Sequence, residues 1–455
     1  MRAVQSGNWT MSITRRRWLQ RTGAFAAGTL GTGVLAACAG LGQQPGAAPA
    51  TKVTQPTTIE LWHWDEFFRD TMQKLGDRFT QSNPSVKVTV VVNSVVNNYY
   101  DKLQTAIVAD ASPAVVGVHP LRQHTTATSG MYRDLNRYLG NDKSFDKADF
   151  YNVGLKAHSW KGQQYGIPHD SAFRLYYYNR DILEKEGVKT PLEYHKEGKW
   201  NWATYLDMAK RLTRDTNGDG EIDQFGTGGE SAIAWGVYLS FLWQNQGDLF
   251  DAGYTKQTVT QAAAREAFTF MKDVSTMAPV AGSGATRENG RVGIWQDWHP
   301  WSVLNASKFS YRYGVAPMVQ GRAQTQLFTG GPAWGIPTAA KNPDSHWPVV
   351  KHLTSKESFT QMFQIAMMPA RKSLDTDALW ASNKNLPTEM RTAFQIAART
   401  GRAMPRVSKF DEMNTALGQA ITSFVRDQQS VGSATEVLAR DLDRLLAESI
   451  VDPIK

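Results

Sequence analysis

Cysteine is almost absent from this chain of 455 residues, in which Cys38 is the only one. An intramolecular disulfide is therefore excluded, and so is any metal site built from several cysteines. Long hydrophobic runs are also missing, because the uncharged residues 22–37 are rich in Ala, Gly and Thr and too few to span a bilayer. The net charge is +8, but five arginines lie in residues 1–37, so composition predicts no nucleic-acid-binding surface.

An export signal is the clearest feature of the N-terminus. Three consecutive arginines at residues 15–17 precede Trp18, Leu19 and the uncharged residues 22–37, a pattern typical of twin-arginine signals. The run Leu35-Ala36-Ala37-Cys38 resembles the lipobox at which bacterial lipoproteins are cleaved and acylated on the new N-terminal cysteine. We therefore predict export out of the cytoplasm.

The same segment predicts how the exported protein is held. Residues 1–37 would form the signal peptide, and Cys38 would carry a lipid that anchors the protein to the bacterial cell membrane, in the periplasm or at the cell surface. Residues 38–56 are rich in Gly, Pro and Ala without periodicity, which indicates a flexible linker between the anchor and a folded body.

From residue 57 onward, strand-like and helix-like patterns alternate. Residues 58–62, 86–92 and 114–118 read as strands, with helical spacing between them, so we predict an α/β fold with a parallel sheet. Ligands bind beyond the carboxyl ends of such strands, where residues 62–65 and His119 would lie. The second half is richer in helices, predicted at residues 205–212, 235–246, 262–274, 413–426 and 433–446.

A set of short motifs, in order, resembles the family-1 extracellular solute-binding proteins, the receptors of ABC importers that include maltose-binding protein. The motifs are Ile59–Trp62, Gly166–Pro168, Tyr178–Asp181, Leu242–Asp251, Gly330–Pro337 and Met368–Ser373. The resemblance implies two α/β lobes joined by hinge strands, with solute held in the cleft between them. It implies chain crossings near residues 170–175, 292–295 and 332–336, a first lobe of residues 57–170 and 296–334, and a second lobe of residues 171–295 and 335–455.

Tryptophan is abundant, with 15 copies, several of them in loop-like segments with Gly, Pro, Asp and His. Sugars present apolar C–H faces and a rim of hydroxyl groups, so a sugar site needs flat aromatic rings and fixed polar groups. The predicted ligand-binding residues are Trp62, Trp64, Asp65, His119, Asp170, Trp243, Gln244, Trp295, Asp297, Trp298, Trp334 and Arg371. Core packing of the tryptophans, and capping or loop bonding by the aspartates, remain alternatives.

Residues 215–223 match the first half of an EF-hand loop, with oxygen-bearing side chains at positions 1, 3, 5 and 9 and Gly220 at position 6. Position 12 is Gly226, where a bidentate Glu belongs, so calcium would need a carboxylate from elsewhere. A structural calcium site and a tight acidic turn are both open interpretations. The possible ligands are Asp215, Asn217, Asp219, Glu221 and Asp223, and no other cofactor is required.

These features predict a monomeric receptor, not an enzyme. It would capture a sugar or oligosaccharide and deliver it to the permease subunits of an ABC importer. The sequence holds no nucleophile elbow, zinc signature or phosphate loop. A secreted glycosidase or lyase, an anchored adhesin or scaffold, and a receptor for a non-sugar solute such as a polyol phosphate remain the alternatives.

Overall fold

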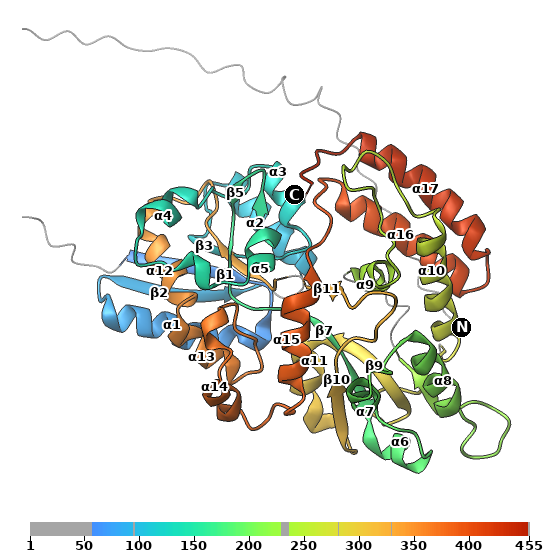
Figure 1. Cartoon of the computed structure of the whole chain (residues 1–455). Coiled ribbons are helices and arrows are strands. Elements are labelled where there is room, and N and C mark those ends of the chain that lie inside the picture. Colours follow the sequence, from blue (N-terminus) through green and yellow to red (C-terminus); the bar gives the residue numbers. More distant parts are fainter. Residues whose placement is uncertain (1–56, 94–95, 229–235, 281, 329, 454–455) are drawn as a thin grey trace, which may run out of the picture. The chain divides into compact units, whose positions relative to one another are not determined.

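The computed structural model describes residues 57–93, 96–228, 236–280, 282–328 and 330–453 (Figure 1). The predicted signal peptide, the lipidation site Cys38 and the linker lie outside the described residues. Among the helices of the described part, none is long and apolar enough to cross a membrane.

A five-stranded mixed sheet organises the first lobe. Its strands, in spatial order, are β2 (Val86–Val92), β1 (Thr57–His63), β3 (Val115–Val118), β12 (Ala333–Gly335) and β6 (Ile167–Pro168). β1 pairs in parallel with β2 and β3, whereas β12 runs antiparallel to β3 and β6. The predicted parallel strands are therefore confirmed, and the two strands added from later in the chain make the sheet mixed.

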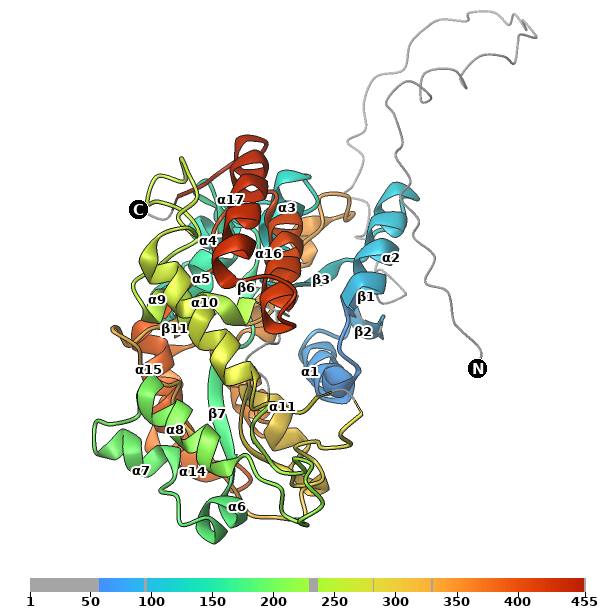
Figure 2. The ribbon, with the colours of Figure 1, turned by 90° about the vertical axis from the view of Figure 1, so that its right-hand side faces the viewer.

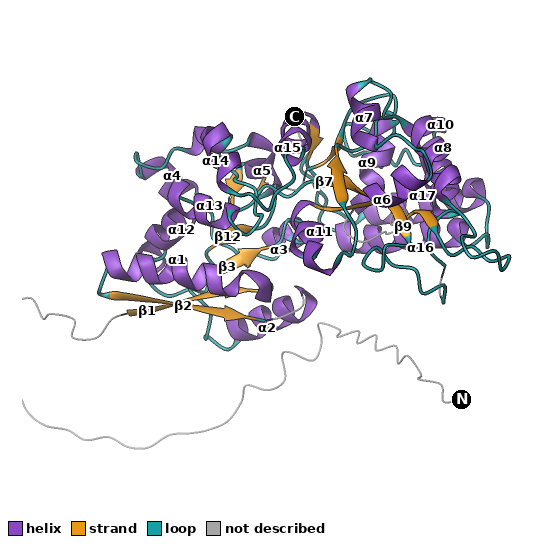
Figure 3. Cartoon of the chain, turned by 90° about the horizontal axis from the view of Figure 1, so that it is seen from below, coloured by secondary structure: helices purple, strands orange, loops and turns teal. Residues whose placement is uncertain are grey.

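Both faces of this sheet are covered, because side chains alternate along each strand. Val115 packs in the core on one face, whereas Val116 and Val118 pack in the core on the other. The first face carries α1 (Arg69–Ser82), α4 (Asn136–Asn141), α5 (Asn152–Ala157), α12 (Trp347–Leu353) and α13 (Lys356–Phe363). The second face carries α2 (Val96–Val108) and α3 (Gln123–Thr128). Figure 3 shows α1 lying along β1 and β2.

A four-stranded sheet organises the second lobe. Its spatial order is β10 (Tyr313–Ala316), β7 (Arg174–Asn179), β9 (Val292–Trp298) and β8 (Phe225–Thr227). β7 is antiparallel to both β10 and β9, while β8 is parallel to β9. All six residues of β7 are buried, since cores lie on both faces: Tyr176 and Tyr178 enter one, and Leu175 and Tyr177 enter the other.

Helices from three parts of the chain cover this second sheet. One face carries α6 (Arg180–Lys185), α8 (Trp202–Leu212), α9 (Val237–Gln244), α10 (Ala262–Ser275), α16 (Phe410–Val425) and α17 (Val431–Ala447). The other carries α11 (His299–Leu304), α14 (Asp377–Ser382) and α15 (Met390–Thr400). α7 (Pro191–Lys196) contacts β10. Two short strand pairs lie outside the two main sheets. They are β4 (Ser159–Trp160) with β5 (Gln163–Gln164), and β11 (Gln326–Leu327) with β13 (Gly401–Arg402). Figure 2 shows α16 and α17 side by side next to α10.

The chain crosses from the first sheet to the second between β6 and β7, where a crossing near residues 170–175 is predicted. It crosses back between β10 and β12. The two linking segments touch through an antiparallel bridge between Phe173 and Phe328. The predicted crossing at residues 292–295 is wrong, because β9 stays in the second sheet between β7 and β8. A local pattern cannot reveal such a pairing, since its partner strands are distant in sequence.

The predicted lobe boundaries also differ from the observed packing. The prediction places residues 296–334 in the first lobe, but they contain β10, which pairs with β7 of the second sheet. It places residues 335–455 in the second lobe, but α12 and α13 pack against α1 of the first. After α13 the chain returns to the second lobe, where α14 and α15 pack.

Candidate functional site

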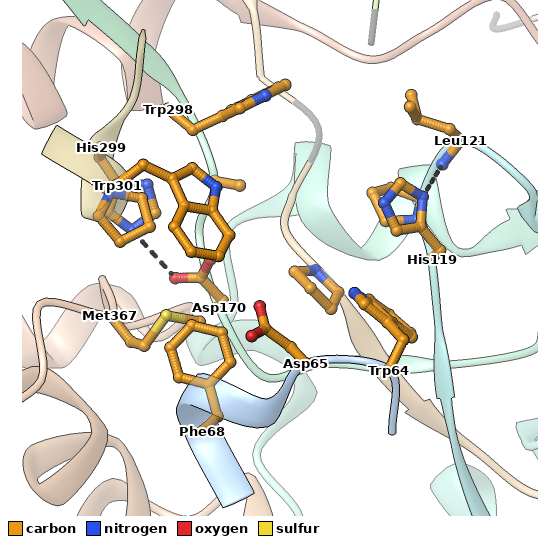
Figure 4. Close-up of a pocket in the computed structure, with 14 residues that line it drawn as sticks. Trp64, Asp65, Phe68, His119, Leu121, Asp170, Trp298, His299, Trp301 and Met367 are labelled. Carbon is orange, nitrogen blue, oxygen red and sulfur yellow. Dashed lines mark hydrogen bonds and ion pairs between the residues drawn. The ribbon is translucent and has the colours of Figure 1, made fainter. Parts of the chain in front are cut away.

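A cavity of about 440 Å³ is lined by residues of both lobes and of the segments that join them (Figure 4). This volume falls within the range of about 300–1,000 Å³ that is usual for small-molecule sites. The lining residues are Trp64, Asp65, Phe68, His119, Pro120, Leu121, Asp170, Ala172, Trp298, His299, Pro300, Trp301, Pro332 and Met367.

The first wall of the cavity follows directly after β1. Asp65 Oδ1 accepts the Phe67 N–H at 3.1 Å and so caps the 3-10 turn Glu66–Phe68, while the Asp65 N–H donates to His63 Nδ1 at 3.0 Å. Trp64 stacks on the buried His63 ring, with 4.2 Å between centroids. Burial raises the pKa of Asp65 and lowers that of His63 well below its usual value, so His63 is a neutral support.

The end of β3 supplies a second wall. The His119 N–H donates to Tyr100 Oη at 2.9 Å, and His119 Nδ1 accepts the Leu121 N–H at 3.2 Å. Burial, together with the nearby His158 and Arg122, lowers the pKa of His119 to about 3. The ring is therefore neutral at pH 7, and because Nδ1 accepts, its proton lies on Nε2.

Asp170 lies in the segment that crosses from β6 to β7, and its side chain is fixed. The residue is only 2% exposed. Its Oδ1 accepts the Met368 N–H at 2.9 Å and lies 3.5 Å from His299 Nε2. Figure 4 shows the Asp170 and Asp65 carboxylates directed into the same space. The site thus presents two carboxylates from different elements.

The remaining wall comes from the end of β9 and the start of α11. Pro300, the second residue of α11, favours this turn because its fixed φ suits the first turn of a helix, where its missing N–H costs no intrahelical hydrogen bond. The Arg174 guanidinium lies 4.8 Å from the centre of the Trp298 ring. The His299 ring stacks on Phe173, with 5.1 Å between centroids. Trp301 remains 38% exposed at this wall.

Five of the predicted ligand-binding residues come together in this cavity: Trp64, Asp65, His119, Asp170 and Trp298. The sequence patterns above do not predict the other nine lining residues. Of these nine, Trp301 is the one that the sequence could have indicated. It follows the predicted residue Trp298 by three positions, a spacing that can place both rings at the mouth of the same cavity. Phe68, Met367 and the prolines have no such signal, since apolar residues of this kind are usually core.

The other predicted residues lie outside this cavity. Trp295 donates its Nε1–H to Ser302 Oγ at 3.0 Å inside the core of the second lobe. Asp297 accepts hydrogen bonds from Arg287 Nη1 at 2.6 Å and Ser302 Oγ at 2.9 Å. Trp334 stacks on His169, with 4.6 Å between centroids, in the core of the first lobe. For these three residues, packing accounts for the side-chain position.

Two further predicted residues of the second lobe are also engaged elsewhere. Gln244 Oε1 accepts the Trp202 Nε1–H at 2.9 Å. Trp243 is covered by the Arg402 guanidinium at 4.4 Å and lines a separate cavity of about 640 Å³.

In the first lobe, Trp62 donates its Nε1–H to Glu60 at 3.1 Å. Arg371 is buried, pairs with Asp149 at 3.2 Å and lies 4.3 Å from the centre of the Phe150 ring. Ligand contact by the residues outside the cavity remains a prediction.

The acidic loop at residues 215–223 is exposed and held by its own hydrogen bonds. Asp215 accepts the N–H groups of Gly218 at 2.7 Å and Gly220 at 2.8 Å, and Asp223 accepts the Thr216 N–H at 2.8 Å. In the portion of the chain that is described, no three His, Cys, Asp or Glu residues are placed to hold a metal ion. Calcium binding by Asp215, Asn217, Asp219, Glu221 and Asp223 stays a prediction.

Comparison with known proteins identifies the family. Residues 74–388 match the family described as bacterial extracellular solute-binding protein. A lactose-binding protein from Rhizobium radiobacter is 25% identical over 165 residues, which cover 35% of this chain and about a third of that relative's own length.

Solved structures share the fold at low sequence identity. An ABC substrate-binding protein from Listeria monocytogenes in complex with cycloalternan is 18% identical with a TM-score of 0.75, and the match covers 86% of this chain and all of that chain. The sugar-binding protein MalE from Xanthomonas citri is 21% identical with a TM-score of 0.71, over 86% of this chain and 98% of that one. The fold is therefore the two-lobe fold of periplasmic binding proteins, and the chain belongs to the bacterial extracellular solute-binding protein family.

Proposed function

We propose that this protein is an extracytoplasmic receptor that holds a sugar or oligosaccharide in the cavity between its lobes. The observation that carries the proposal is the combination of Trp64, Trp298 and Trp301 with the carboxylates of Asp65 and Asp170 in one cavity. Indole rings stack on the C–H faces of a sugar ring, and carboxylates accept hydrogen bonds from its hydroxyl groups.

The relatives support a sugar as the ligand. The Listeria monocytogenes protein holds cycloalternan, and the GacH receptor of Streptomyces glaucescens, 20% identical with a TM-score of 0.72 over 86% of this chain and 99% of that one, has been solved with acarbose. The curated relative binds lactose. These ligands differ in size and linkage, so the proposal names the carbohydrate class and leaves the individual sugar to experiment.

Delivery would depend on closure of the two lobes around the ligand. Contacts from both lobes are made only when the cavity is shut, so the ligand favours the closed form by its differential affinity for it. We propose that the permease subunits of an ABC importer recognise that form and receive the sugar unchanged. A dissociation constant near 1 μM corresponds to about −8 kcal/mol, which is the affinity we expect.

We also propose that the twin-arginine signal exports the chain and that a lipid on Cys38 tethers a monomeric receptor to the membrane. Replacing Cys38 with Ser would release the protein from the membrane fraction if this is right. Metabolic labelling with a radioactive fatty acid would report the same attachment, and label retained by Cys38→Ser would contradict it.

The binding proposal is tested by titrating the full chain with an oligosaccharide panel while recording tryptophan fluorescence. We expect saturable quenching. We also expect Trp298→Ala to weaken binding by about 5- to 150-fold, because stacking and apolar burial contribute about 1–3 kcal/mol per ring. Trp380→Phe is the matched control, since Trp380 packs against Phe363 and Phe394 outside the cavity, and it should bind like the unmodified protein.

Chromatography of the same mixtures separates a receptor from the alternative of a glycosidase or lyase. A receptor returns every oligosaccharide intact after prolonged incubation. Shorter products would reject the proposal in favour of an enzyme, and the absence of any quenching across neutral oligosaccharides would reject a sugar ligand.

A further inference from the structure

The ionisable groups that line the cavity are two carboxyl groups and the imidazoles of His119 and His299. Asp65 and Asp170 are the acids among the lining residues, and the described lining includes no Lys or Arg. His119 is neutral because burial lowers its pKa to about 3. The lining therefore offers a ligand two carboxyl groups and no ammonium or guanidinium group.

Cations behind the wall are engaged with other groups. Arg287 Nη1 lies 2.6 Å from Asp297 Oδ2, and Arg122 Nη1 lies 3.9 Å from Asp411. Arg174 packs on the Trp298 ring at 4.8 Å and donates to Gln296 at 3.4 Å. Among the lining residues, the basic side chain nearest to either carboxylate is the His299 imidazole, whose Nε2 lies 3.5 Å from Asp170 Oδ1.

The same two carboxylates can accept more hydrogen bonds than they receive from the described residues. An ionised carboxylate offers about four lone-pair positions. Asp170 accepts one hydrogen bond, from the Met368 N–H, and Asp65 accepts one, from the Phe67 N–H. Neither Oδ2 atom accepts a hydrogen bond from any described residue. A ligand that satisfies them must bring hydrogen-bond donors, because a buried acceptor left unpaired costs free energy.

We propose that Asp65 and Asp170 together select saccharides by charge: the cavity accepts uncharged or positively charged saccharides and excludes those bearing a carboxylate or a phosphate. Hydroxyl and ammonium groups donate to the open Oδ2 atoms. A carboxylate or phosphate brings a like charge and only acceptors, and burial in a closed cavity strengthens that repulsion. The inference rests on the proposed sugar-binding function and assigns its specificity to two residues.

Calorimetric titration of the full chain tests this selection with matched ligands. The probes are lactose and maltose, their 6-phosphates, and the amino analogues in which one hydroxyl of each disaccharide is replaced by a free amine. We expect the better neutral disaccharide to bind, its 6-phosphate to bind at least 100-fold more weakly, and its amine to bind no more weakly than the neutral form.

Two variants assign the selection to its residues. Asp170→Asn and Asp65→Asn should each reduce the discrimination against the 6-phosphate at least tenfold, whereas Asp77→Asn on the exposed side of α1 should leave it unchanged. If Asp170→Asn fails to fold because its hydrogen bond to the Met368 N–H is altered, the affinities of Asp65→Asn for the neutral disaccharide and its 6-phosphate still test the selection.

The outcomes also separate this inference from the function on which it rests. A 6-phosphate that binds as tightly as its neutral parent overturns the charge selection and leaves the sugar receptor standing. Discrimination that persists unchanged in both variants overturns the assignment to Asp65 and Asp170. Absence of binding by every neutral, phosphorylated and amino disaccharide overturns both proposals.

Discussion

Two tryptophans on one strand have different structural roles in this protein. Trp295 and Trp298 lie three residues apart in β9, and because side chains alternate along a strand, they point to opposite faces of the sheet. Trp295 is 1% exposed and packs in the core with Tyr177, whereas Trp298 lines the cavity beneath the Arg174 guanidinium. Direction along the strand therefore separates a structural ring from a candidate binding ring.

We predict that Trp295→Ala lowers the free energy of unfolding by about 3–5 kcal/mol, since it removes a fully buried ring and a buried hydrogen bond. Trp298→Ala should lower it by about 1–2 kcal/mol at most, because the ring is only partly buried. Urea denaturation of both variants measures this difference. Equal destabilisation by the two substitutions would contradict the assignment of Trp295 to the core and Trp298 to the cavity.

The candidate site was partly predictable at the level of residues. Trp64, Asp65 and His119 follow β1 and β3, so the rule that ligands bind beyond the carboxyl ends of parallel strands was enough to place them at the cavity. The same rule could not show that Trp243 and Arg371 lie outside the cavity. Their surroundings, Arg402 over one and Asp149 beside the other, come from residues far away in sequence.

At the scale of elements, the segment that crosses from the second lobe into β12 depends on glycine. Gly331 has a φ of +68°, and a Cβ atom at this position would lie 2.3 Å from the Asp170 carbonyl oxygen. Its own carbonyl oxygen accepts a hydrogen bond from His158 Nε2–H at 2.7 Å. This close approach fixes the crossing segment against the residue that supplies one cavity carboxylate.

We predict that Gly331→Ala destabilises the protein by at least about 2 kcal/mol and weakens sugar binding, because both the positive φ and the backbone contact oppose a side chain. Gly140→Ala in α4 is the matched control, since nothing lies within 4 Å of its added Cβ, and it should be neutral or slightly stabilising. Thermal unfolding and fluorescence titration measure the two effects. A Gly331→Ala protein with unchanged stability and affinity would refute this account of the hinge.

The positions of helices and strands were easier to predict from the sequence than the pairing between strands. The predicted helix over residues 262–274 is α10 (Ala262–Ser275), and the predicted strand over residues 86–92 is β2, because strong periodicity and clear end signals act locally. The lobe boundaries depend on which distant strands pair, as β10 does with β7. Local periodicity carries no information about such partners.

At the scale of the whole molecule, burial keeps a group of histidines neutral: His119, His124, His158 and His169. Desolvation, with smaller effects of neighbouring charges, lowers the pKa of His158 and His169 to about 4 and that of His119 and His124 to about 3. The folded protein therefore keeps these rings neutral at pH 5, where the unfolded chain, with a usual histidine pKa near 6.5, is protonated.

We predict that stability falls as the pH drops from 6.5 towards 4, because the unfolded state binds more protons than the folded state over this window. Each buried histidine contributes up to about 1.4 kcal/mol per pH unit. His169→Phe should make the decline shallower, since it keeps a ring against Trp334 and removes a group whose ring nitrogens have no hydrogen-bond partner among the described residues. Calorimetric melting temperatures between pH 8 and pH 5 measure this, and a flat profile would disprove the neutral histidine cluster.

As a receptor, the protein should close around a neutral saccharide and release it unaltered. The most direct measurement is small-angle X-ray scattering of the full chain, with and without the oligosaccharide that binds most tightly, followed by chromatography of the recovered sugar. We expect a smaller radius of gyration at saturation and complete recovery of intact ligand. An unchanged radius of gyration at saturation, or a cleaved sugar, would contradict it.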